Sequence, residues 1–241
     1  RLQVEHPVTE EVFGVDLVGA MLRLASGEQA DREQLDAEIF GHDHEPSGHA
    51  IEARIYAEDP DRGSAPCPGR LTCVRFPGQD AATIEGVRVE SGVETGNEIT
   101  PDYDPMIAKL IAWGPTRADA IELFGEAAAS SRVDGVVTNL GLVSELISST
   151  QFRRVEHSTS SLATTKDPTA RIDVLDAGTF TSIQDWPGRL GYWQVGVPPS
   201  GPMDQASFRL ANQVVGNPEG APGLECTVRG PSLRFSEPAI V

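Results

Sequence analysis

The alternation of apolar and polar residues predicts a strand at residues 49–57, where the two kinds of side chain exchange at every position. One face carries Ile51, Ala53, Ile55 and Ala57, and the other carries Glu52, Arg54 and Tyr56. Side chains of a strand point alternately to opposite faces. We therefore expect this strand to bury its apolar face and to present its polar side chains on the other face.

Similar patterns predict the rest of residues 1 to about 155. Short strands are expected at 71–76 and 87–93, and an apolar strand at 106–113 is interrupted only by Lys109. Helices are expected at 9–26, at 116–130 behind a capping box of Thr116 and Asp119, and at about 139–148. We expect the four strands to share one largely antiparallel sheet, with the first two helices packed on it.

The pattern changes near residue 157 and divides the chain. We expect a first domain at 1–156 that lacks its front, a Ser/Thr-rich linker at 157–171 and the truncated start of a second domain at 172–241. The second domain has short strands between Gly/Pro turns and one helix at about 204–215, capped by Asp204. The predicted fold class is α+β followed by a partial β-rich domain.

Composition narrows the class of protein. The chain has 241 residues, a formal charge of −17 and three cysteines without metal-type spacing. Such a charge disfavours nucleic acid and anionic membranes as partners. The cysteines favour reduced thiols over disulfides or a metal site, and we expect a soluble, acidic cytoplasmic protein.

A polar cluster opens the chain with Arg1, Gln3 and Glu5, which share one face if the segment is extended. A guanidinium beside an amide can receive a small planar oxyanion, and a carboxylate at the same anion can act as a general base. The same residues also fit a solvated polar strand with a weak surface ion pair. The pattern alone leaves both readings open.

Several motifs of the first domain closely resemble the C-terminal third of biotin carboxylase, a member of the ATP-grasp superfamily. These are RLQVEHPVTE at 1–10, GHAIEARIYAEDP at 48–60, PGRLTCVRFPG at 68–78, TPDYDPMIAKLIAWG at 100–114 and RVDGVVTNLGLVSELI at 132–147. The resemblance implies a mixed, largely antiparallel sheet with helices, and biotin carboxylation driven by ATP and bicarbonate.

The resemblance also implies roles for individual residues. Arg1, Gln3 and the backbone N–H of Val4 would bind bicarbonate, and Glu5 would deprotonate it for attack on the γ-phosphate of ATP. Arg54 would stabilise the oxyanion that develops on biotin, although on its own it could equally form a cross-strand ion pair. The family binds ATP and Mg mainly through residues that this sequence does not contain, so we expect no metal ligands here and an inactive fragment. Asp102 stands where the family usually has Tyr, which leaves the local packing open.

Candidate residues in the second domain are weaker. The run VPPSGPMD delivers Ser200 and Asp204 to a helix N-terminus, where N–H groups can bind a carbonyl or carboxylate, while Asp204 can also be a simple cap. Asp185 in QDWPGR could form a substrate wall or part of a turn around a core Trp. This stretch resembles the allophanate-hydrolase-subunit-2-like family, which includes carboxyltransferase domains with a cyclophilin-like β-rich fold.

The order of the two pieces resembles that in the urea carboxylase family. It implies transfer of a carboxyl group from biotin to urea to give allophanate, with a biotin carrier domain of the same protein as partner and a homodimer through the biotin carboxylase domain. Another amide-like acceptor, such as guanidine, stays open. So does a non-catalytic regulatory module, although such a module would have no need of the Glu5 base.

Overall fold

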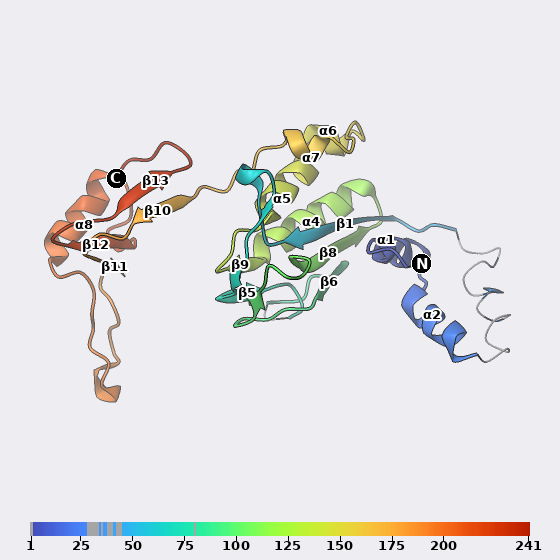
Figure 1. Cartoon of the computed structure of the whole chain (residues 1–241), viewed down its shortest axis with the longest axis horizontal. Coiled ribbons are helices and arrows are strands. Elements are labelled where there is room, and N and C mark those ends of the chain that lie inside the picture. The colour runs from blue at the N-terminus through green and yellow to red at the C-terminus, as the bar shows by residue number, and fades with distance from the viewer. Residues whose placement is uncertain (1, 28–33, 35, 38–40, 42–44, 80) are drawn as a thin grey trace. The chain divides into compact units, whose positions relative to one another are not determined.

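The chain forms two compact units, residues 1–169 and 170–241, in a computed structural model (Figure 1). The structure describes residues 2–27, 34, 36–37, 41, 45–79 and 81–241. The polar sequence of residues 28–48 predicts a loop, and most of it lies outside the described residues.

A three-stranded antiparallel sheet forms the centre of the first unit, in the order β1-β8-β6. These strands are β1 (His49–Tyr56), β8 (Met106–Gly114) and β6 (Val87–Ser91). Arg54 of β1 lies opposite Lys109 of β8, and Lys109 lies opposite Glu90 of β6. Directly opposed residues share a face, so one face of the sheet carries a row of charges across all three strands.

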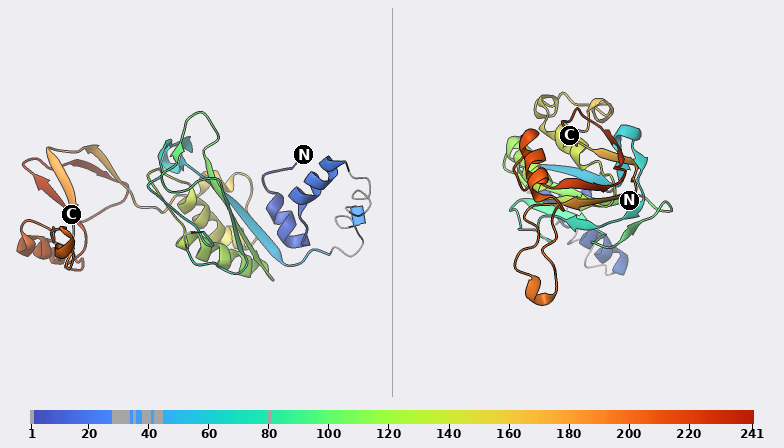
Figure 2. Two further views of the ribbon diagram at one scale, coloured as in Figure 1. Left: turned by 90° about the horizontal axis from the view of Figure 1, so that it is seen from below. Right: turned by 90° about the vertical axis from the view of Figure 1, so that its left-hand side faces the viewer.

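The other face of the sheet packs against α4 (Arg117–Ser130), which lies along it (Figure 2). The predicted capping box is confirmed: the Thr116 side chain accepts from the N–H of Asp119, and the Asp119 carboxylate accepts from the N–H of Thr116. Ile121, Phe124 and Ala128 of this helix are buried. They join Ile51, Ala53, Ile55 and Leu110 in one apolar core.

The helix expected at 9–26 is two helices, α1 (His6–Phe13) and α2 (Leu17–Ser26). Gly14 ends α1 in the left-handed region with φ of 65°, and the Asp16 side chain begins α2 by accepting from the N–H of Gly19. Glu10 also supports the break between the helices. Its carboxylate accepts from the N–H of Leu17, the first residue of α2, at 2.8 Å. The start was also placed too late, since α1 begins at His6 and Thr9 lies inside it.

The prediction that four strands share one sheet is wrong for one of them. β5 (Cys73–Arg75) pairs instead with β9 (Arg132–Asp134), which directly follows α4. Two-residue strands form further antiparallel pairs beside it: β2 (Glu58–Asp59) with β3 (Ala65–Pro66), and β4 (Gly69–Arg70) with β7 (Glu98–Ile99). The 3-10 turn η1 (Pro60–Arg62) lies between β2 and β3.

The first unit continues beyond β9 with further helices. They are α5 (Leu140–Ser148), α6 (Thr150–Arg153) and α7 (Ser161–Thr164). The position of α5 agrees with the helix expected at 139–148. The Ser/Thr-rich segment expected as a linker contains α7, which packs on α5 and buries Ser161, so part of this segment belongs to the first unit.

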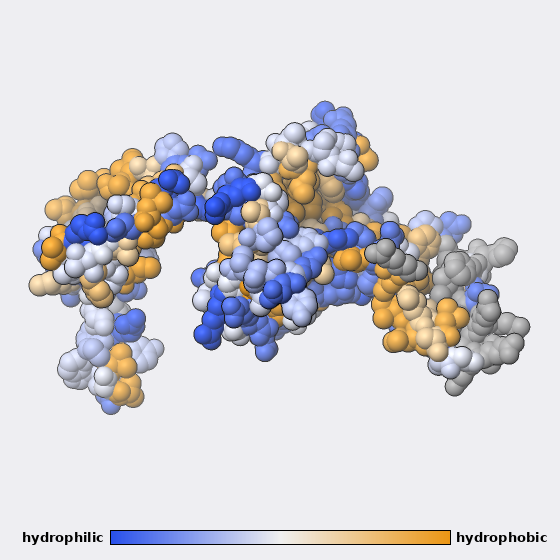
Figure 3. Space-filling model, viewed as in Figure 1, coloured by the Kyte–Doolittle hydropathy of each residue, from blue (hydrophilic) through white to orange (hydrophobic). Residues whose placement is uncertain are grey.

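The second unit pairs its strands in antiparallel ladders between segments far apart in the sequence. β10 (Ile172–Asp176) pairs with β13 (Ser232–Phe235), and β11 (Phe180–Gln184) pairs with β12 (Gly223–Thr227). The predicted helix is α8 (Gln205–Val214), and η2 (Trp193–Val195) forms a short turn. Apolar side chains gather on the face in view in Figure 3, and Ile183 and Val214 are about three-quarters exposed at 74% and 76%.

In the part of the chain that the structure describes, no helix has the length and apolar character needed to cross a bilayer.

The substitution Phe124→Ala should strongly destabilise the first unit. Phe124 is 0% exposed, and loss of a buried aromatic side chain costs about 3–5 kcal/mol because a cavity remains. Native-state hydrogen exchange of the β8 amides measures the effect. Glu122→Ala on the exposed side of the same helix is the control and should leave β8 protection within about 0.5 kcal/mol. Equal protection in the two variants would show that the core is placed wrongly.

Candidate active site

Residues 3–5 form a turn at the N-terminus of α1. The N–H of His6 donates to the carbonyl of Gln3 at 3.3 Å, and the N–H of Val8 donates to the carbonyl of Glu5 at 3.2 Å. Glu5 stands at the N-cap position, but its carboxylate makes no capping hydrogen bond to the helix. The carboxylate is therefore left for another partner beside the positive end of the helix.

That partner is Arg54, which reaches the Glu5 carboxylate from β1 as an ion pair. The Arg54 guanidinium also donates to the Tyr56 hydroxyl at 3.3 Å. The ion pair closes one side of a cavity of about 360 Å³ that is lined by Leu2, Gln3, Val4, Glu5 and Arg54. Four residues singled out from the sequence thus lie together, although Glu5 and Arg54 are 49 positions apart.

The charges at this cavity are held in their ionised forms. The pKa of Glu5 is lowered by its own backbone N–H and further by Arg54. The pKa of Arg54 is raised by the hydrogen bond to Tyr56 and by the charge of Glu5. An ionised carboxylate beside a guanidinium can take a proton from an anion that the guanidinium and nearby N–H groups bind.

Lys109 lies under the same turn, and its residue is only 7% exposed. Its ammonium donates to the carbonyl of Val4 at 3.3 Å and forms an ion pair with Glu90. Glu90 in turn pairs with Arg88, which donates to Glu10 of α1 at 2.9 Å and to Glu11 at 3.2 Å. A continuous set of charges therefore joins the sheet to both the turn and α1.

Glu52 occupies the same face of β1 and has both carboxylate oxygens buried without a hydrogen-bond partner among the described residues. Burial raises its pKa to about 7; the charges of Glu5 and Glu90 act in the same direction, and Lys109 opposes them. Glu52 is thus an acid that changes charge near neutral pH beneath the Glu5–Arg54 pair.

Sequence reasoning named Glu5 and Arg54 but gave no role to Lys109 or Glu52. A signal for each was present. Lys109 is the single charge in an apolar strand, and Glu52 precedes Arg54 by two residues and so shares its face. What the sequence did not contain was the pairing of β1 with β8, which places Arg54 and Lys109 side by side.

Arg1, the remaining residue proposed for bicarbonate, lies outside the described residues. In the second unit, Asp204 caps α8 by accepting from the N–H groups of Ala206 and Ser207 at 3.1 and 3.0 Å. The Ser207 hydroxyl and N–H, more than any other group, hold the pKa of Asp204 below its usual value. The structure accounts for this carboxylate as a cap.

Ser200 and Asp185 lie on exposed turns that adjoin each other. The N–H of Arg189, in the turn after Asp185, donates to the carbonyl of Pro199 at 2.6 Å. Ser200 has a positive φ of 56°. Trp186, the aromatic residue of the first turn, stacks under the Arg209 guanidinium at 4.4 Å. The geometry brings the two turns together but assigns no chemistry to them.

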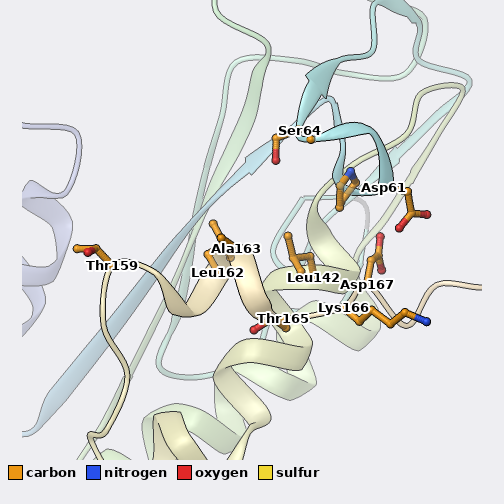
Figure 4. Close-up of a pocket in the computed structure, with 11 residues that line it drawn as sticks. Asp61, Ser64, Leu142, Thr159, Leu162, Ala163, Thr165, Lys166 and Asp167 are labelled. Carbon is orange, nitrogen blue, oxygen red and sulfur yellow. The ribbon is translucent and has the colours of Figure 1, made fainter.

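A larger cavity of about 480 Å³ lies elsewhere in the first unit, between η1 and the helices α5 and α7 (Figure 4). Its lining includes Ser64, Leu142, Leu162 and Lys166. None of the residues with predicted chemistry lines it, so we place the candidate active site at the smaller cavity. Among the described residues, no cluster of three or more His, Cys, Asp or Glu side chains could hold a metal ion.

Models of known protein families match successive parts of this chain, in the same order as the motifs described above. The biotin carboxylase C-terminal domain matches residues 52–164, and the carboxyltransferase domain, subdomain A and B, matches residues 195–241. The ATP binding domain of the carbamoyl-phosphate synthase L chain matches residues 1–33.

Similar proteins carry both pieces in one chain. The urea amidolyase of Saccharomyces cerevisiae is 44% identical over 98% of this chain, and the putative urea carboxylase of Emericella nidulans is 43% identical over 100% of it. This chain spans only 12% and 19% of those proteins. The crystal structure of the Kluyveromyces lactis urea carboxylase matches with a TM-score of 0.81 and 44% identity, over 98% of this chain and 20% of that one.

The substitution Glu52→Gln should make the stability of the first unit less dependent on pH. A carboxyl group whose pKa is raised by folding favours the fold below its unfolded value near 4.5, and this contribution is lost as the pH rises through about 7. The variant cannot ionise, so relative to the parent it should gain protection of β1 amides between pH 5 and pH 8. Glu122→Gln, at an exposed position, should show the same offset from the parent at both pH values. Parallel behaviour of Glu52→Gln and the parent would contradict a raised pKa at Glu52.

Proposed function

Because this chain belongs to the family of urea carboxylases and urea amidolyases, we propose that it supplies the bicarbonate site of a biotin-dependent, ATP-dependent carboxylase. The single observation that carries the proposal is the meeting of Gln3, Val4, Glu5 and Arg54 at one cavity. Since the chain spans about an eighth to a fifth of its relatives, the activity of a whole enzyme is part of the proposal.

Bicarbonate is the substrate of this cavity in our proposal. The Gln3 amide and the backbone N–H of Val4 donate to its oxygens, and Arg1 adds a guanidinium. The Glu5 carboxylate accepts its proton and so prepares it to attack the γ-phosphate of ATP. The lowered pKa of Glu5 keeps it ionised before the anion arrives, and the positive end of α1 favours negative charge at this place.

Arg54 faces the cavity with a guanidinium that suits an oxyanion, and this fits the ureido oxygen of biotin. When bound, biotin supplies the nitrogen that accepts the carboxyl group. Arg54 would donate to the oxygen on which negative charge grows, and Tyr56 would help to orient the guanidinium. The change of partner from Glu5 to biotin makes Arg54 the link between the two halves of the reaction.

ATP and Mg are proposed as further requirements of the whole enzyme. Among the described residues no cluster of side chains could hold the metal, and in our proposal the rest of the enzyme supplies its ligands. The match of residues 1–33 to an ATP binding domain supports nucleotide chemistry next to the turn that contains Glu5.

Urea is the proposed acceptor, with allophanate as product, because similar proteins that match over nearly the full chain carry urea in their names. We propose that residues 172–241 begin a β-rich, cyclophilin-like carboxyltransferase domain. Asp185, Ser200 and Asp204 are candidate residues of its carboxyltransferase site. A biotin carrier domain of the same protein, a homodimer and a cytoplasmic location complete the proposal. Free thiols at all three cysteines support that location.

Two substitutions should separate the roles of Glu5 and Arg54 in the complete enzyme. Glu5→Gln removes the base and should depress bicarbonate-dependent ATP hydrolysis as well as biotin carboxylation. Arg54→Ala should depress biotin carboxylation by about 10²–10³, the usual effect of losing one oxyanion donor, and spare biotin-independent ATP hydrolysis more. Phosphate release with and without biotin, at saturating bicarbonate, measures both.

Arg75→Ala is the matched control, since Arg75 is an exposed arginine on β5, and it should leave both rates unchanged. The assigned roles would be overturned if Arg54→Ala abolished basal ATP hydrolysis as fully as Glu5→Gln while biotin carboxylation survived.

A further inference from the structure

Lys109 presents a physical problem that the proposed chemistry does not solve. It lies at the centre of the middle strand, its side chain is 8% exposed, and the residues around it in the strand are apolar. A buried ammonium ion is costly unless it is paired, and an apolar side chain would fill the same place at lower cost. Glu90 balances the charge. The second contact, to the carbonyl of Val4, is not needed for charge balance and therefore points to another role.

The contact to Val4 acts on the peptide group that joins Val4 to Glu5. This group is planar, so a cation that holds its carbonyl also fixes the direction in which the chain enters Glu5. Arg54 holds the carboxylate of the same residue. Arg54 and Lys109 are direct cross-strand neighbours. These two cations therefore bind the turn at two points: Lys109 at the backbone carbonyl of Val4, and Arg54 at the side chain of Glu5.

The proposed reaction affects the Arg54–Glu5 contact and the Lys109–Val4 contact differently. Arg54 must change partner when biotin arrives, and during that change it no longer holds Glu5. Lys109 faces no such demand, since it is buried and tied to Glu90. If Arg54 were the only contact that fixed the turn, the turn would become free to move on the sheet when Arg54 binds biotin.

We propose that Lys109 is a positioning residue that holds the Gln3–Glu5 turn on the sheet through the carbonyl of Val4, so that the turn keeps its geometry when Arg54 leaves Glu5. This inference rests on the proposed function for its catalytic meaning. Its structural content, the fixing of the turn by Lys109, stands independently of any activity.

The structural content can be tested on the chain as it is. Lys109→Met has a side chain of similar length without the charge, Lys109→Arg keeps a cation, and Lys166→Met changes the other lysine of the sequence, which lies at the larger cavity. In hydrogen exchange, the amides of His6 and Val8, which close the turn, should exchange about tenfold faster or more in Lys109→Met, as expected for loss of a charge-assisted hydrogen bond. Lys109→Arg should restore most of the protection, and Lys166→Met should not alter it.

The amides of α4, on the opposite face of the sheet, serve as the internal reference. Faster exchange at His6 and Val8 with unchanged α4 supports the proposal. Unchanged exchange at the turn overturns it, and so does an equal loss of protection at the turn and α4, because Lys109 would then only support the sheet.

The catalytic content needs the complete enzyme. Lys109→Met should raise the KM for bicarbonate about tenfold or more and leave the KM for ATP near that of the parent, with rescue by Lys109→Arg. A fall in kcat with both KM values unchanged would overturn the positioning role. If the exchange result holds but no variant, nor the parent, shows bicarbonate-dependent ATP hydrolysis, the proposed function fails while the assignment of Lys109 to the turn remains.

Discussion

The antiparallel pairing of β1 with β8 is the constraint on which the first unit depends. Its register sets Arg54 beside Lys109 and, through β8, places both in one row with Glu90. The same register sends Ile51, Ala53 and Leu110 to the opposite face, where α4 closes the core. One pairing therefore fixes both the hydrophobic side that stabilises the unit and the charged side on which the turn at Glu5 is built.

The charged side is itself a connected structure. Glu10 of α1 ends one helix, accepts from the first turn of α2 and receives Arg88 from the sheet. Arg88 and Lys109 then share Glu90. Ion pairs and hydrogen bonds thus tie α1 to the sheet, and Glu10 is only 7% exposed. The buried members depend on this network most, because loss of Arg88 or Glu90 would remove an ion-pair partner from Glu10 or from Lys109, whose side chains are 6% and 8% exposed.

Local patterns predicted most of the elements of the first unit. The strict alternation at 49–57 and the capping box at Thr116 left little choice of structure, and both agree with the sequence prediction. The break at Gly14 was missed because the apolar stripe runs on through it, and only the caps at Gly14 and Asp16 reveal two helices. The partner of β5 was missed for a different reason, since strand pairing is a long-range property that a local pattern does not contain.

At the candidate site, too, the sequence predicted what motifs contain and missed what depends on strand pairing. Glu5 and Arg54 came from a resemblance of motifs, whereas the buried state of Glu52 and the contact of Lys109 with Val4 follow from which strands lie side by side. In the second unit the local signals were again sound, as Asp204 does cap α8. They gave no information on the exposed apolar residues of its strands, because exposure depends on what packs against a strand.

The two-faced character of β1 and β8 restricts how the length of this chain can vary. Removal or insertion of a single residue inside either strand would exchange the faces beyond that point, sending Arg54 or Lys109 into the core and apolar side chains to the turn. The strands meet one irregularity in their register, between Ile55 and Tyr56, where β8 contributes one extra residue. An odd change in length in the connecting loops would leave both faces as they are, whereas one between Ile55 and Tyr56 would turn Tyr56 away from Arg54. The two-residue spacings from Glu52 to Arg54 and from Arg54 to Tyr56 are accordingly fixed by the fold, while the lengths of the loops around β1 and β8 are not.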